Sequence, residues 1–281
     1  MTKMLWLDRL LVERLERKTA YVEELLEKNK NNWEETFYQI IARNFGFKTN
    51  AEPFEQLARS LPLITLAKHK NNLMQIEALL FGQAGLLEKD FEDEYPNKLK
   101  KEYLFLQKKH SLNPVQNESW KFLRMRPASF PTIRIAQFAQ LIFSSVHLFS
   151  KILVAKNVEE LEHLFDLKLS NYWQTHYVFD KASVKRNKKL GKSAIHLLVI
   201  NTIAPFLFLY GKRKDNEDYK EKAFQLLEEI KPEKNSIITK WKALGMEPES
   251  AYQTQALLQL KNEYCTKKRC LECAVGNAIL K

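Results

Sequence analysis

Hydrophobic residues recur along this chain at the spacing of α-helices. Between Leu5 and Lys28, leucines and a valine lie three, four or seven positions apart, and pairs of opposite charge lie four positions apart. This is the pattern of an amphipathic helix. A second helix is expected from Asn32, an N-cap residue with a glutamate three positions later, to Gly46.

Nine further segments show apolar spacing near 3.6 residues, and most are separated by Pro, Gly or Asn. They cover about 52–60, 70–81, 97–109, 132–147, 158–166, 192–210, 217–229, 236–244 and 250–264. No segment shows a convincing strand alternation, and 7 glycines and 9 prolines in 281 residues are few for a sheet protein. The sequence therefore predicts an all-α fold, a compact multi-helix domain with orthogonal helical packing and no substantial sheet.

The chain is expected to be a single helical unit over residues 1–281, with a seam near 110–118, its most linker-like stretch. Its start lacks the uncharged core and cleavage site of a signal peptide, and its cysteine usage favours a reducing compartment, so we expect a cytoplasmic protein. The uncharged run from Ala194 to Tyr210 is typical of a buried core helix rather than a membrane span.

Basic residues give the chain a formal charge of +11, and two windows carry this excess. Residues 119–158 hold six basic and no acidic side chains, and residues 181–214 hold nine and again none. Local excess positive charge favours polyanionic partners without identifying one, and we expect the partner to be DNA or RNA.

The first window contains RMRPASFPTIR, in which Arg124, Arg126 and Arg134 surround two prolines. The free N–H groups of a helix beginning at Thr132 would form an anion site together with the guanidinium groups. The alternative is that these arginines cap helix ends or pair with acids such as Glu118.

The second window contains KASVKRNKKLGK, with Lys185, Arg186, Lys188 and Lys189 at its centre. A basic loop of this density contacts nucleic-acid backbone, an anionic membrane surface or an acidic partner, and it carries no base-reading information by itself. The alternative is a solvated loop.

Three cysteines, Cys265, Cys270 and Cys273, form a C-x4-C-x2-C pattern in a carboxyl-terminal loop over 265–273. Thiolates at this spacing hold zinc or an iron–sulfur cluster when a fourth ligand completes the set. Basic residues inside the loop would lower the pKa of the thiols and attract phosphate. The alternative is three ordinary reduced thiols.

Several segments together resemble an uncharacterised bacterial family, domain-of-unknown-function family 2851. They are NWEETFYQIIARNFGFKTNAEPFEQLA, IEALLFGQAGLL, RMRPASFPTIRIAQFAQL, KSAIHLLVINTIAPFLF and ALLQLKNEYCTKKRCLECAVGN. The resemblance implies that longer members carry an extra amino-terminal domain similar to restriction-endonuclease-like nucleases. This chain is similar to the helical remainder.

The leading hypothesis is therefore a non-catalytic, nucleic-acid-binding accessory module that contacts the phosphate backbone. The alternative is a protein-interaction or scaffold module whose amphipathic first helix docks on a separate or missing amino-terminal domain or on another chain. An enzyme that binds a small phosphorylated substrate at the arginine cluster is the third hypothesis, and no catalytic residue is assigned.

Overall fold

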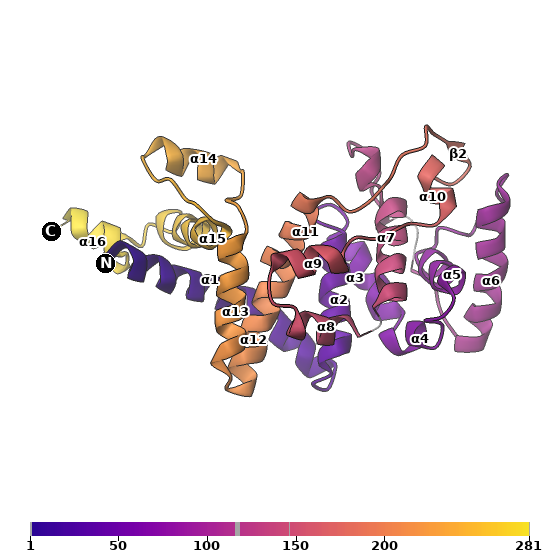
Figure 1. The fold of residues 1–281 in the computed structure, drawn as a ribbon, viewed down its shortest axis with the longest axis horizontal. Coiled ribbons are helices and arrows are strands. Elements are labelled where there is room, and N and C mark those ends of the chain that lie inside the picture. Colours follow the sequence, from indigo (N-terminus) through magenta and orange to yellow (C-terminus); the bar gives the residue numbers. More distant parts are fainter. Residues whose placement is uncertain (1, 116–118, 146, 281) are drawn as a thin grey trace. The chain divides into compact units, whose positions relative to one another are not determined.

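The computed structural model describes residues 2–115, 119–145 and 147–280, and the chain within them is almost entirely helical (Figure 1). The predicted all-α fold is confirmed. Residues 116–118, part of the expected seam, lie outside the described residues. Contacts divide the chain into two compact units: unit 1 comprises 1–25, 156–158 and 199–281, and unit 2 comprises 26–155 and 159–198.

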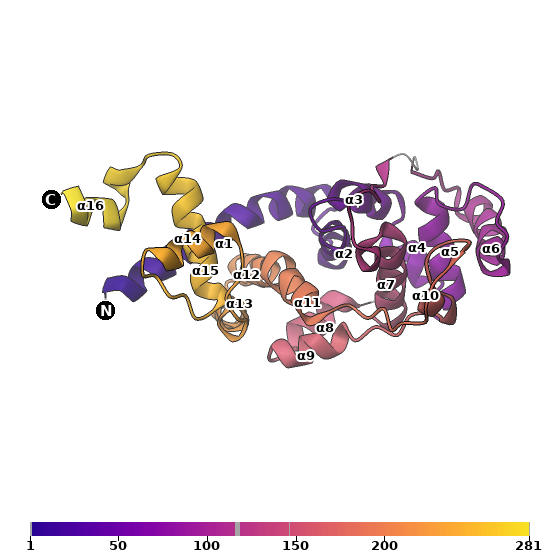
Figure 2. The ribbon, with the colours of Figure 1, turned by 90° about the horizontal axis from the view of Figure 1, so that it is seen from above.

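Unit 1 contains most of the first helix and the carboxyl-terminal helices. In order they are α1 (Thr2–Lys28), η3 (Val199–Ile203), α12 (Ala204–Lys214), α13 (Glu217–Glu229), α14 (Ser236–Ala243), α15 (Ala251–Gln259), η4 (Leu260–Cys265), η5 (Cys270–Glu272) and α16 (Ala274–Leu280). Figure 2 shows α12 and α13 next to each other, and they form the main contact in this unit. Asp215, in the left-handed conformation, ends α12, and the Asn216 side chain then caps α13.

The predicted helix at 192–210 is interrupted by a π-helical turn, η3. Pro205 lacks an N–H group, so the helix cannot keep its regular hydrogen bonds one turn earlier. Lys18 of α1 lies at this irregularity, and its Nζ donates to the carbonyl oxygen of Ile200 at 3.2 Å and to Asn201 Oδ1 at 3.0 Å. The Lys18 side chain thus donates to a backbone carbonyl group at the π-turn.

Unit 2 contains the remaining elements. They are α2 (Trp33–Phe45), α3 (Ala51–Ser60), α4 (Leu63–Ala67), α5 (Leu73–Gln83), α6 (Glu94–His110), η2 (Pro127–Ser129), α7 (Pro131–Ser144), α8 (Leu148–Val154), α9 (Val158–Leu164), α10 (Asn171–Thr175), β1 (His176–Val178), β2 (Lys181–Ala182) and α11 (Lys192–Leu198). The strands form one antiparallel hairpin in which His176 faces Ala182 and Val178 faces Lys181. This hairpin and the short helices α4, α8 and α10 are not among the segments expected from periodicity.

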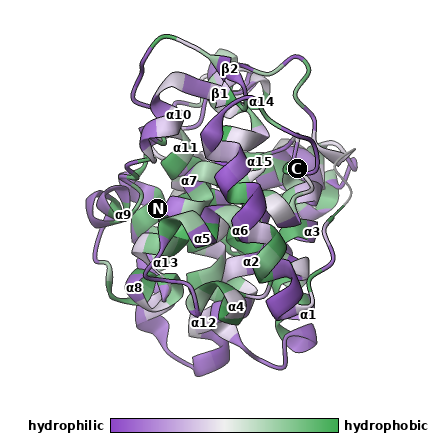
Figure 3. Cartoon of the chain, turned by 90° about the vertical axis from the view of Figure 1, so that its right-hand side faces the viewer, coloured by the Kyte–Doolittle hydropathy of each residue, from purple (hydrophilic) through white to green (hydrophobic). Residues whose placement is uncertain are grey.

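The core of unit 2 is built where α2, α3, α5, α6 and α7 pack, and hydrophobic residues follow α2, α5 and α7 in Figure 3. The ring of Phe138 on α7 lies 5.2 Å from that of Phe45 and 5.7 Å from that of Tyr38. Helices α5 and α6 approach closely because Gly82 has no side chain. A Cβ atom there would lie 2.0 Å from the ring of Tyr103.

One continuous helical stretch among the described residues, Lys192–Lys214, is long and apolar enough to cross a membrane, with the π-helical turn η3 inside it. A bent pair, Pro131–Ser144 with Leu148–Val154, passes the same test only if it is counted as one span. Within Lys192–Lys214, 72% of the most apolar window is buried in the protein. A core helix that is mostly buried passes the same test of length and composition.

Candidate anion-binding site

The basic segment of the second window runs back along α10 as an extended chain. The N–H of Ser183 donates to the carbonyl oxygen of Thr175 at 2.6 Å, and the N–H of Arg186 donates to that of Gln174 at 2.9 Å. Asp180, whose φ of 60° lies in the left-handed region, turns the chain between β1 and β2. The segment is therefore held by main-chain hydrogen bonds rather than being a freely solvated loop.

Lys188 anchors this segment. Lys188 is only 6% exposed, and its Nζ donates to the carbonyl oxygens of Trp173 at 2.7 Å and Gln174 at 2.8 Å. The same ammonium lies 4.2 Å from the centre of the Tyr177 ring. Burial, reinforced by the charge of Arg186, lowers the pKa of Lys188. The structure thus gives Lys188 an internal task instead of the surface phosphate contact expected for it.

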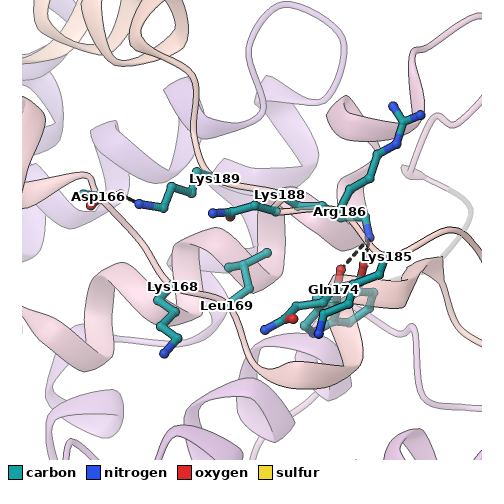
Figure 4. A pocket seen from close by; sticks show the side chains of 10 residues that line it. Asp166, Lys168, Leu169, Gln174, Lys185, Arg186, Lys188 and Lys189 are labelled. Carbon is teal, nitrogen blue, oxygen red and sulfur yellow. Dashed lines mark hydrogen bonds and ion pairs between the residues drawn. The ribbon is translucent and has the colours of Figure 1, made fainter.

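A cavity of ≈ 500 Å³ opens between the extended segment and the chain that leads into α10 (Figure 4). It is lined by Asp166, Lys168, Leu169, Trp173, Gln174, Lys185, Arg186, Asn187, Lys188 and Lys189, which include five basic side chains and one carboxylate. Lys189 Nζ pairs with Asp166 at 2.5 Å. Among the described residues, no carboxylate pairs with Lys168, Lys185 or Arg186, and all three side chains are exposed.

The basic character of the cavity ends at the Asp166–Lys189 pair. A second cavity of ≈ 580 Å³ shares these two residues but is also lined by Glu159 and Glu162. Glu162 accepts from Lys192 Nζ at 2.6 Å, which holds the pKa of this carboxyl below its ordinary value. Because the second cavity holds acids beside its lysines, only the first carries a clear excess of positive charge.

The two basic windows meet in unit 2 through Gln137 of α7. Arg134 Nη1 donates to Gln137 Oε1 at 2.9 Å, and Gln137 Nε2 donates to the carbonyl oxygen of Lys188 at 2.8 Å. Arg134 is half-buried over the Phe47 ring, its Nε has no hydrogen-bond partner among the described residues, and burial lowers its pKa to about 10. It is placed as a support for the basic segment.

The other two predicted arginines lie on the surface. Arg124 and Arg126 are exposed, and neither pairs with a carboxylate in the described part of the chain. Glu118, the acid suggested as a partner, lies outside the described residues. The lining residues of the first cavity are 166, 168, 169, 173, 174 and 185–189, so these two arginines are not part of it.

Sequence reasoning missed the other wall of the cavity. Lys168 is an isolated lysine between hydrophobic residues, and Gln174 and Asn187 carry no charge. The inward orientation of Lys188 could have been inferred from its spacing to a hydrophobic residue. Leu190, two residues later, is 5% exposed, and alternate residues of an extended chain share a face.

The three cysteines lie in unit 1, where Cys265 and Cys270 are exposed and Cys273 is buried. No group of three or more His, Cys, Asp or Glu side chains among the described residues is arranged to hold a metal ion. Zinc or iron–sulfur binding here remains a prediction from the sequence. The expected lowering of thiol pKa is wrong for Cys265, because partial desolvation of its sulfur and the neighbouring Cys273 raise that pKa.

Two of the three cations in the basic loop, Lys267 and Arg269, are already paired with carboxylates, so they add little positive field at that thiol. Lys267 Nζ lies 2.6 Å from Glu263 Oε2, and Arg269 Nε donates to Glu272 Oε1 at 3.1 Å. Opposite charges at this distance cancel much of each other's field.

Fold and cavity together define an all-α protein with a positively charged surface pocket. A family model described as protein of unknown function (DUF2851) matches residues 1–236. The chain therefore belongs to this family. No curated protein and no solved structure matches the chain.

Proposed function

We propose that this chain binds nucleic acid through the phosphate backbone, using the positively charged cavity beside α10. The observation that carries the proposal is that Lys168, Lys185 and Arg186 line one cavity without a carboxylate partner among the described residues. Cations that are not neutralised within the protein attract phosphates and release counterions when they bind them.

Preorganisation supports the same proposal. The backbone that carries Lys185 and Arg186 is fixed by hydrogen bonds to Gln174 and Thr175 and by the buried ammonium of Lys188. A fixed segment loses less conformational entropy on binding than a free loop does. Arg124 and Arg126, exposed on the same unit, add positive charge that steers a polyanion towards the protein.

The scaffold alternative receives no comparable support. The docking surface expected for it was the apolar face of α1, and the residues of that face are buried. Leu7, Leu10, Leu11, Leu15, Val22, Leu25 and Leu26 are each 7% exposed or less. This face is thus covered within the protein itself.

A charge-reversal variant tests the proposal. Replacing Lys168, Lys185 and Arg186 with glutamate should weaken binding of a fluorescent oligonucleotide about tenfold or more at 0.1 M salt, because three phosphate contacts become repulsive. The matched control reverses Lys101, Lys108 and Lys240, which are exposed and lie outside the cavity.

Both variants lower the net charge equally, so a general charge effect would weaken them equally. The proposal requires a much larger loss in the cavity variant. Equal affinity of wild type and cavity variant, with both chains folded by circular dichroism, would reject it.

A further inference from the structure

The cavity offers more space than a phosphate backbone needs. Its volume of ≈ 500 Å³ lies within the usual range of small-ligand pockets, roughly 300–1,000 Å³. A duplex presents phosphates and sugars at its surface and keeps its bases stacked inside, so it has no group to fill such a cavity. An unpaired nucleotide has one, because its base is free to leave the strand.

The lining of the cavity is suited to a base. Leu169, 8% exposed, gives the cavity an apolar wall backed by the fully buried Trp173, while Gln174 and Asn187 bring amide groups to the same space. Gln174 Nε2 donates to Asn171 Oδ1 at 3.3 Å, which leaves the Gln174 side-chain oxygen as an acceptor.

The exposed Asn187 amide has both a donor and an acceptor, and among the described residues it has no hydrogen-bond partner. Donors and acceptors beside an apolar wall are what recognition of an unpaired base requires. The cations lie on the same two chain segments as the amides, and all of them line a single cavity.

We propose that this cavity takes the base of one unpaired nucleotide while Lys168, Lys185 and Arg186 hold the adjoining phosphates. The inference rests on the proposed function and narrows it to single-stranded nucleic acid. A duplex would have to unpair and unstack a base to make the same contacts, which costs free energy.

The test compares three ligands of matched length by fluorescence anisotropy with the full chain. They are a single-stranded 12-mer, the same strand in a duplex, and the same strand carrying abasic tetrahydrofuran units. We expect the single strand to bind about tenfold more tightly than the duplex. The abasic strand has the same charge but no bases, and it should lose about fivefold.

A double variant separates the base contact from the charge contact. Gln174→Ala with Asn187→Ala removes both amides and no charge, so it should lower single-strand affinity towards the duplex value and leave duplex binding unchanged. Gln56→Ala, an exposed amide on α3 outside the cavity, is the control and should bind like wild type.

The outcomes distinguish the two proposals. Equal binding of single strand, duplex and abasic strand would overturn the base-binding inference and leave backbone binding standing. If none of the three ligands binds, the proposed function fails and the inference fails with it.

Discussion

A buried carboxyl group in unit 2 gives the structure a measurable pH dependence. Glu77 on α5 is 2% exposed, its Oε2 accepts from the Tyr95 hydroxyl at 2.5 Å, and its Oε1 accepts from the Ser170 hydroxyl at 3.2 Å. Burial raises its pKa from 4.5 to about 7, although both hydrogen bonds act in the opposite direction. We therefore expect the fold to favour the protonated acid.

The sign and size of the effect follow from these two values. Well below pH 4.5 Glu77 is protonated in both the folded and the unfolded chain, so it adds no penalty. As pH rises towards 7 the unfolded chain ionises first, and stability is lost. Above pH 7 the full cost of the buried charge is present, which corresponds to about 3 kcal/mol.

The substitution Glu77→Gln removes the charge and keeps the shape. At pH 8 the variant should be more stable than wild type by up to about 3 kcal/mol, and near pH 4.5 the difference should shrink by nearly that amount. Urea denaturation followed by tryptophan fluorescence at both pH values measures this. A poor fit of the new amide would change the stability of the variant equally at both pH values. A stability difference between variant and wild type that is the same at both pH values would therefore refute the reasoning.

Three further outcomes are expected. Gly82→Ala should lower the free energy of unfolding by about 1–3 kcal/mol in urea titrations, because its new methyl group meets a tyrosine ring on α6. Gly191→Ala is the control and should leave the free energy of unfolding unchanged, because a Cβ atom added there would have no neighbouring atom within 4 Å. Lys188→Met should lower the free energy of unfolding by about 1–3 kcal/mol in the same assay, since it leaves the buried carbonyl oxygen of Trp173 without its donor. An unchanged midpoint of urea denaturation would contradict the anchoring role of Lys188. Burial and His69 lower the pKa of His110, whose Nε2 lies 2.9 Å from that of His69. As pH falls, His110 therefore takes up a proton in the unfolded chain before it does so in the folded chain, which favours unfolding. The melting temperature should fall more between pH 7 and pH 5 in wild type than in His110→Asn.

The long helices could be predicted because their ends carry local signals. Asn32 and Gly46 bracket α2 as expected, and the Asn32 side chain accepts from the Glu35 N–H at 3.1 Å. Short elements could not be predicted in this way. Strands of three and two residues, as in β1 and β2, are too short to show a period, and their pairing depends on a turn at Asp180.

The candidate site could be predicted only in part. Clustered charge identified Lys185 and Arg186, but charge density does not reveal which side chain of an extended segment faces inward, so Lys188 was misplaced on the surface. Lys168 and Gln174 join the cavity through chain reversal at the hairpin, a long-range feature that no local pattern encodes. The sequence shows where basic residues cluster, but only the packed structure shows which of them are exposed and unpaired.

The salt dependence of nucleic-acid binding by the wild-type chain tests the central claim most directly. Three cations that meet phosphates release counterions, so the logarithm of the association constant should fall linearly with the logarithm of salt concentration, with a slope of about −2 to −3. Removing Lys168, Lys185 and Arg186 should bring that slope close to zero. Undetectable binding at low salt, or a slope that these substitutions leave unchanged, would contradict the account.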